Sequence, residues 1–129
     1  MTHFTVDWYI KNRVVLATIE SDFLSIQEIK SINDALVAHL RASDATNLYA
    51  ILDCRKIDKF QANIALINQT VTFVREPNLR WVIVISDDKM LNLTANIVAQ
   101  VSHIKLRNSP GVEEGAKFLR SVDPTLTLP

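Results

Sequence analysis

The sequence predicts one α/β domain over residues 1–129, with the element order ββαβαβαβα. Two observations lead to this prediction: short apolar strands alternate with amphipathic helices, and the links between them are short. The length of 129 residues is a third, because it is usual for one domain and too short for two. Alternation of this kind implies right-handed parallel crossovers, and so a mixed, mostly parallel sheet of about five strands with helices packed on it.

The first two strands are predicted to form a β-hairpin across residues 4–20. Apolar residues alternate with polar ones from Phe4 to Ile10, and the run RVVLATIE follows directly after Lys11 and Asn12. Asparagine tolerates the left-handed backbone conformation that a tight turn requires.

The next element is a helix that runs to about residue 42. Ser25 and Glu28 have the spacing of a capping box, and Leu24 and Ile29 stand at the positions of a hydrophobic staple. Apolar residues then recur at helical spacing, which predicts one buried face.

A strand at Leu48–Asp53 and a helix at 62–75 follow. The strand is almost wholly apolar, which is typical of a strand covered on both faces. The helix has one apolar row and is closed by Pro77; the row contains Ile64, Ile67, Val71 and Val74.

The run WVIVIS at residues 81–86 predicts a strand, since it joins four β-branched residues and a tryptophan without a break. Asp87 or Asp88 is expected to cap the helix that runs from there to about Val101.

A weaker strand is predicted at His103–Arg107, before a last helix. Ser109 is expected as the N-cap of that helix and Pro110 as its first residue. Pro124 lies beyond its end.

Charge and hydropathy exclude several classes of partner. Lys plus Arg equal Asp plus Glu, at 14 each, whereas a domain that binds nucleic acid or an acidic membrane through its overall field is basic. The start MTHFTVDWYI lacks a basic region followed by a long apolar run, and no apolar stretch reaches about 18 residues. We therefore expect a cytoplasmic protein without a nucleic-acid partner or a membrane span.

The sequence also lacks the common enzyme motifs. Two glycines build neither a dinucleotide-binding turn nor a P-loop, and no G-x-S-x-G nucleophile elbow occurs. The three histidines are far apart, and no Cys/His cluster has zinc-site spacing. We expect no metal and no cofactor.

Cys54 is the only thiol. Arg55 and Lys56 would lower its pKa if they faced it, and His39 or His103 would then supply a base. A lone cysteine after a buried strand is, however, usually a small core residue. Both interpretations stay open from the sequence.

Polar residues gather where two strands end. If these strands are neighbours, Asp53 and Asp87 end them at the same edge of the sheet, where open α/β sheets hold ligands. The alternative for Asp87 and Asp88 is helix capping. The polar site residues predicted at this edge are Asp53, Arg55, Lys56, Ser86, Asp87 and Lys89.

The helix at 62–75 has a second apolar row, formed by Leu66, Thr70 and Phe73, with Phe60 before it. A surface helix normally keeps one apolar stripe. The second row is either buried in the monomer or a contact surface for another chain. Gln61 and Asn63 complete the predicted binding surface.

The element order and length resemble the STAS family, the fold of the bacterial anti-sigma-factor antagonists. The stretch YAILDCRKIDKFQANIALIN bears the closest likeness, and the ending VEEGAKFL is similar to that of uncharacterised bacterial STAS-like proteins. In the family, a central strand ends in Asp, and a D-S-[ST]-G motif opens the next helix. A partner kinase phosphorylates the Ser or Thr of that motif.

Aligned with this pattern, Asp53 falls on the strand-end aspartate, and the motif falls on Gln61, Ala62, Asn63 and Ile64. Neither phosphorylatable position, now Ala62 and Asn63, has a hydroxyl. The resemblance therefore implies a STAS-like regulatory domain without the phosphorylation switch.

Three functions follow from these observations. The first is a non-enzymatic interaction module that docks a protein, or a second copy of itself, through the helix at 62–75 and the loop before it. The second is a small-ligand sensor or carrier whose pocket is lined by Phe60, Phe73 and Trp81. The third is an enzyme that uses Cys54 or Asp53.

Overall fold

The structure is a computed structural model that describes residues 3–61 and 63–126, so Ala62 lies outside the described residues. Its main sheet has five strands in the order β1-β2-β4-β6-β7. Only β1 runs antiparallel to its neighbour, which confirms the mixed, mostly parallel sheet. The strands are β1 (Phe4–Ile10), β2 (Val14–Ile19), β4 (Leu48–Asp53), β6 (Leu79–Ile85) and β7 (Lys105–Ser109).

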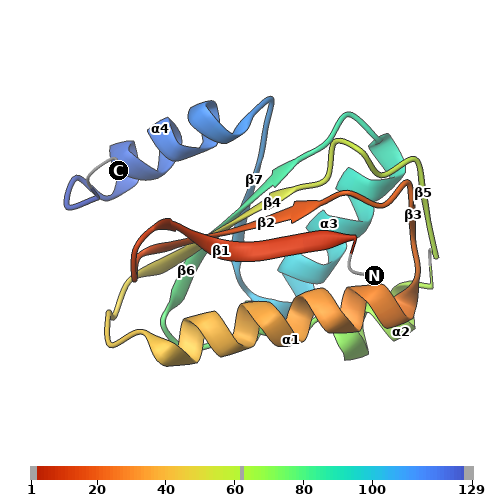
Figure 1. The fold of residues 1–129 in the computed structure, drawn as a ribbon, viewed down its shortest axis with the longest axis horizontal. Coiled ribbons are helices and arrows are strands. Elements are labelled where there is room, and N and C mark those ends of the chain that lie inside the picture. Colours follow the sequence, from red (N-terminus) through yellow and green to blue (C-terminus); the bar gives the residue numbers. More distant parts are fainter. Residues whose placement is uncertain (1–2, 62, 127–129) are drawn as a thin grey trace.

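The helices form a layer on each side of this sheet (Figure 1). The chain steps from β2 to β4, β6 and β7 in one direction, and right-handed crossovers then place the three intervening helices on the same face. The remaining helix follows the last strand and packs on the opposite face. The helices are α1 (Ile26–Ala42), α2 (Ile64–Thr70), α3 (Lys89–Ser102) and α4 (Val112–Val122).

The central strand β6 supplies side chains to both layers. Successive residues of a strand point to opposite faces. Val82 and Val84 accordingly join the core beneath α1, α2 and α3, whereas Ile83 and Ile85 join the core beneath α4. This arrangement explains why the strand is apolar without a break.

The turn signal at Asn12 and the N-cap signal at Ser25 are confirmed. Asn12 joins β1 to β2 in the left-handed region, at φ 63°. Ser25 caps α1, because its hydroxyl accepts a hydrogen bond from the backbone nitrogen of Glu28 at 3.1 Å. The carboxylate of Glu28 accepts from the hydroxyl of Ser21, which anchors this helix end to the segment after β2.

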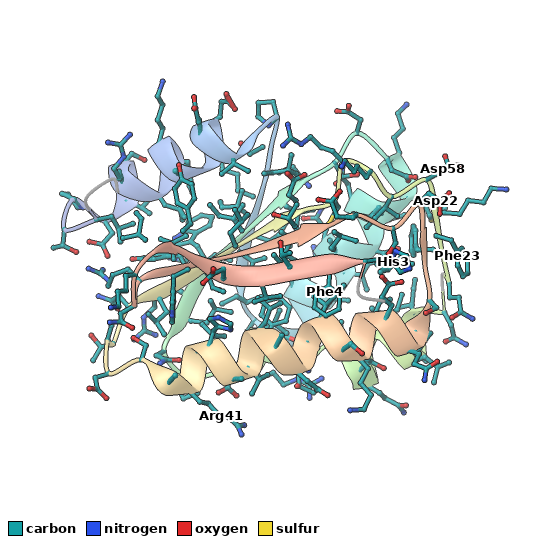
Figure 2. All side chains as sticks on the ribbon, in the orientation of Figure 1. His3, Phe4, Asp22, Phe23, Arg41 and Asp58 are labelled. Atoms are coloured by element: carbon teal, nitrogen blue, oxygen red, sulfur yellow. The ribbon has the colours of Figure 1, made fainter. Side chains whose placement is uncertain are left out.

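A second, two-stranded sheet was not predicted. It pairs β3 (Phe23–Leu24) with β5 (Lys59–Phe60) in parallel. The backbone nitrogens of Asp58 and Lys59 both donate to the carbonyl of Asp22. Figure 2 places Asp22, Phe23 and Asp58 together at this end of the molecule.

The predicted helix at 62–75 was wrong in its extent. α2 ends at Thr70, and a separate 3₁₀ turn, η1 (Phe73–Arg75), follows it. The side chain of Asn33 in α1 binds the backbone at the break, accepting from the nitrogens of Thr72 and Phe73. These bonds replace the intrahelical bonds that a continuous helix would make.

Two boundaries near the C-terminal end also differ from the prediction. His103 lies in a left-handed turn that ends α3, at φ 59°, so β7 begins at Lys105. Ser109 continues β7, paired with Ile85, and is not a helix cap. Gly111 is the N-cap of α4, so Pro110 precedes the helix.

Among the described residues, no helix combines the length and the apolar character needed to cross a membrane.

Candidate functional site

The carboxyl ends of β4 and β6 meet at one edge of the sheet, as predicted. Asp53 is in register with Ile85, so the segments that follow both strands leave the sheet side by side. Arg55 and Lys56 come from the first segment, and Ser86 and Asp87 from the second. This edge is where open α/β sheets hold ligands.

Asp53 is nearly buried and is neutralised by its neighbour Arg55. The guanidinium donates to both carboxylate oxygens, from Nε at 2.9 Å and from Nη2 at 2.7 Å. These bonds lower the pKa of Asp53 below its usual value, against the opposing effect of burial. A carboxylate held in this way is a weak general base.

Lys56 and Ser86 at this edge also have partners. Lys56 pairs with Glu20, which follows β2. The hydroxyl of Ser86 accepts from the backbone nitrogen of Asp88 at 3.0 Å. Asp88 is the residue that caps α3, through bonds from the backbone nitrogens of Met90 and Leu91; Asp87 and Lys89 are exposed.

Cys54 lies in the core. Its side chain is buried, and burial is the main cause that raises the pKa of its thiol to about 12, with Asp53 adding to the effect. Arg55 and Lys56 pair with carboxylates and so do not lower this pKa. These facts favour the structural interpretation of Cys54 over the nucleophile.

Two polar residues of the predicted binding surface make hydrogen bonds at the start of α2. The side-chain oxygen of Gln61 accepts from the backbone nitrogen of Ile26 at 2.6 Å, which ties this loop to the start of α1. Asn63 is the N-cap of α2, because its side-chain oxygen accepts from the backbone nitrogen of Leu66 at 3.1 Å.

The second apolar row of the predicted helix is divided between core and surface. Leu66 is 43% exposed and Ile64 is 38% exposed, although Ile64 had been assigned to the core row. Phe73 is only 3% exposed, so of the two alternatives left open for this row, burial in the monomer holds for Phe73. The physical reason is the helix break, because the 3₁₀ turn swings Phe73 into the core.

An apolar cavity of about 140 Å³ lies between the sheet and the three helices α1, α2 and α3. Phe60 and Phe73 line it, as predicted for a ligand pocket. Trp81 does not line it, because it lies on the opposite face of the sheet. There it packs edge-to-face against Phe118, with the two ring centroids 4.8 Å apart. Asn33 and Thr94 are the polar residues of the lining.

A second exposed apolar feature escaped the sequence analysis. Met90, Leu93 and Val101 in α3 are each more than half exposed. Their spacing of three and then eight residues places them on one helix face, so the signal was present in the sequence.

No metal site was found: in the part of the chain that the structure describes, no three His, Cys, Asp or Glu side chains come together as ligands would.

The sheet order and the two helix layers define a STAS-like α/β domain, as the sequence predicted. The fold is that of an uncharacterised protein of the DUF3478 family with a SpoIIAA-like fold, from Shewanella loihica PV-4. The two chains superpose with a TM-score of 0.64 at 9% sequence identity, over 90% of this chain and 91% of that chain. No protein-family model and no curated protein matches the sequence.

Proposed function

We propose that the chain is a non-enzymatic regulatory domain that docks a protein partner through the α2 face, formed by Gln61, Asn63, Ile64 and Leu66. The observation that supports this function is the exposure of two large aliphatic side chains, Ile64 and Leu66, on a seven-residue helix that buries only Ile67. Such side chains gain free energy when a partner removes them from water, about 25 cal/mol for each Å² of apolar surface.

The polar groups beside this face favour docking over catalysis. Asp53 is paired with Arg55, and Lys56 with Glu20. Cys54 is buried with a raised pKa. A reaction that used Asp53 or Lys56 would first have to break one of these pairs, whereas docking on α2 leaves both of them intact.

Asn63 is the N-cap of α2 and, with Ala62, is one of the two positions that the STAS resemblance assigns to the phosphorylatable Ser or Thr. A phosphate there adds nearly two negative charges at a helix start and remakes an interface. The amide of Asn63 has no hydroxyl to modify, so we propose that docking on the α2 face is not switched by phosphorylation of this residue.

The test is site-specific photocrosslinking in the native cells. A benzophenone amino acid replaces Leu66, and a matched control replaces Gln69, an exposed neighbour on the same helix. We expect one discrete adduct from position 66 that is absent from position 69. The protein in that adduct, once purified, should bind the wild type and lose at least about tenfold in affinity for Leu66→Lys. Equal crosslinking from both positions would contradict the proposal.

The apolar cavity supports a second candidate, the binding of a small apolar ligand. Cavities near 150 Å³ that are lined by aliphatic and aromatic side chains stay dry and accept molecules about the size of benzene. We expect benzene to raise the melting temperature of the protein, because it binds the folded state alone. Val71→Phe adds volume at the half-buried edge of the lining and should remove this shift. An unchanged melting temperature in the wild type would exclude this candidate.

A further inference from the structure

Helix α3 has an exposed apolar row that the core of the domain does not use. Met90 and Leu93 are each 54% exposed and Val101 is 56% exposed, while Ile97 between them is half-buried. Spacings of three and four residues place all four on one face. The buried residues of α3 form a different row: Leu91, Thr94, Val98 and Ala99.

The row lies on a helix whose only charged residue is its first, Lys89. No Asp, Glu, Lys, Arg or His occurs from Met90 to Ser102, and the polar residues of this segment are neutral. An ordinary solvent-facing helix presents charged residues on its outer face. Depletion of charged residues, together with exposed aliphatic ones, is typical of the core of a protein interface.

The absence of charged residues from Met90 to Ser102 also restricts the kind of partner that can bind this row. Helices that lie on lipid surfaces have Lys and Arg along their polar face, and here only Lys89 stands at the start of the helix. A charged partner segment would lose its hydration without gaining an ion pair. A second copy of this helix avoids that loss, because it has the same uncharged segment from Met90 to Ser102.

We propose that this row is the interface between two copies of the chain, which pair through antiparallel α3 helices. The spacing of three and then four residues is that of helices packing at about 20° with side chains interlocked. A twofold axis near residue 95 places Leu93 of each copy against Ile97 of the other. Met90 then lies near Val101 of the other copy, and the two helix dipoles oppose each other favourably.

The size of the row sets the expected strength of the dimer. It spans twelve residues, from Met90 to Val101, or roughly 16 Å of helix, whereas a standard interface buries about 800 Å² on each partner. The dimer is therefore of modest affinity and forms in a concentration-dependent way. This surface is distinct from the α2 face, and the inference does not depend on the proposed function.

The first experiment is sedimentation velocity over low micromolar to near-millimolar concentrations. We expect the wild type to shift from monomer to dimer. Leu93→Lys places an unpaired charge in the interface and should weaken association by about 100-fold or more. The matched control is Val122→Lys, which also replaces an exposed aliphatic residue but lies on α4, on the opposite side of the sheet. The control should dimerise as the wild type does.

A mixing experiment tests the antiparallel arrangement. Leu93→Lys and Ile97→Glu should each be monomeric alone, yet form a heterodimer when mixed, because the introduced lysine of one copy faces the introduced glutamate of the other. If Ile97→Glu does not fold by circular dichroism, Met90→Lys mixed with Val101→Glu makes the same test at more exposed positions.

Four results would overturn the proposal. The first is a wild type that stays monomeric at every concentration. The second is a Leu93→Lys protein that associates as the wild type does. The third is a pair of folded variants that do not associate when mixed. The fourth is a monomer that binds phosphatidylcholine vesicles through this row and loses that binding in Leu93→Lys, since lipid would then be its occupant.

Discussion

The side-chain oxygen of Asn33 accepts a hydrogen bond from the backbone nitrogen of Phe73 at 2.8 Å, forty residues away in the chain. The same oxygen accepts from the backbone nitrogen of Thr72 at 2.8 Å, and the side-chain nitrogen donates to the hydroxyl of Thr72 at 2.9 Å. Asn33 is buried, so these bonds form away from competing water. They hold the end of α2 and the start of η1 in place.

We expect Asn33→Leu to lower the free energy of unfolding by about 2–3 kcal/mol, because it leaves two backbone N–H groups without partners. Urea unfolding followed by circular dichroism measures the loss. Asn96→Leu is the control, since the side chain of Asn96 donates only to the carbonyl of Asn92 within its own helix. A similar loss in both variants would contradict the role given to Asn33.

The Asn33 contact also explains which parts of the fold were predictable. The β1–β2 hairpin and the start of α1 were predicted from signals within a few residues, at Asn12 and Ser25. The break after α2 depends on a side chain forty residues away, and no local pattern contains it. For the same reason the pairing of β3 with β5 was missed, because it joins two-residue strands that are far apart in the chain.

The candidate site was predictable in location but not in its contacts. Alternating strands and helices imply parallel strands, so the carboxyl ends of β4 and β6 meet at one edge as expected. The register pairs Asp53 with Ile85, the last residue of β6, and Asp87 follows two residues later. The partner of Lys56 is Glu20, which directly follows β2. Neither the residue types nor their spacing in the sequence predicted this pair. The burial of Phe73 depends on the helix break, so local sequence patterns did not predict it either.

The Asp53–Arg55 pair should give a measurable pH dependence of stability. The folded pKa of Asp53 lies below its usual value of 3.8, mainly through the hydrogen bonds from Arg55. The stabilisation is therefore fully present above pH 3.8 and is lost as pH falls through the lower, folded-state pKa. Arg55 is 53% exposed, so we expect about 1 kcal/mol or less.

Arg55→Met tests this pair by urea unfolding at pH 7 and at pH 2. The variant should be less stable than the wild type at neutral pH and nearly equal to it at pH 2. Arg75→Met is the control, because Arg75 is exposed and donates to a backbone carbonyl of Asn68, not to a carboxylate. A difference that does not change with pH would exclude the ion pair as its cause.

Cys54 should react slowly with thiol reagents in the folded protein. Burial raises its pKa to about 12, so almost no thiolate is present at pH 8, and its 6% exposure hinders access. We expect Ellman's reagent to label it only as fast as the protein opens, and at once in denaturing urea. Labelling in the native state at the rate of free cysteine would contradict this structure and revive the nucleophile interpretation.

Gly115 allows α4 to lie close to the sheet. A Cβ at this position would lie 2.8 Å from Cγ2 of Ile83, a fully buried residue of β6. Alanine favours a helix over glycine by about 1 kcal/mol, but overpacking a core costs about 1–3 kcal/mol. We expect the clash to outweigh the helix preference, so that Gly115→Ala lowers the free energy of unfolding by about 1 kcal/mol.

Gly111→Ser is the control. The nearest atoms to its Cβ would be those of the flexible carboxylate of Glu114, and serine is a favourable N-cap. Thermal unfolding should show a lower melting temperature for Gly115→Ala and an equal or higher one for Gly111→Ser. A Gly115→Ala protein as stable as the wild type would mean that α4 moves away from Ile83 at little cost.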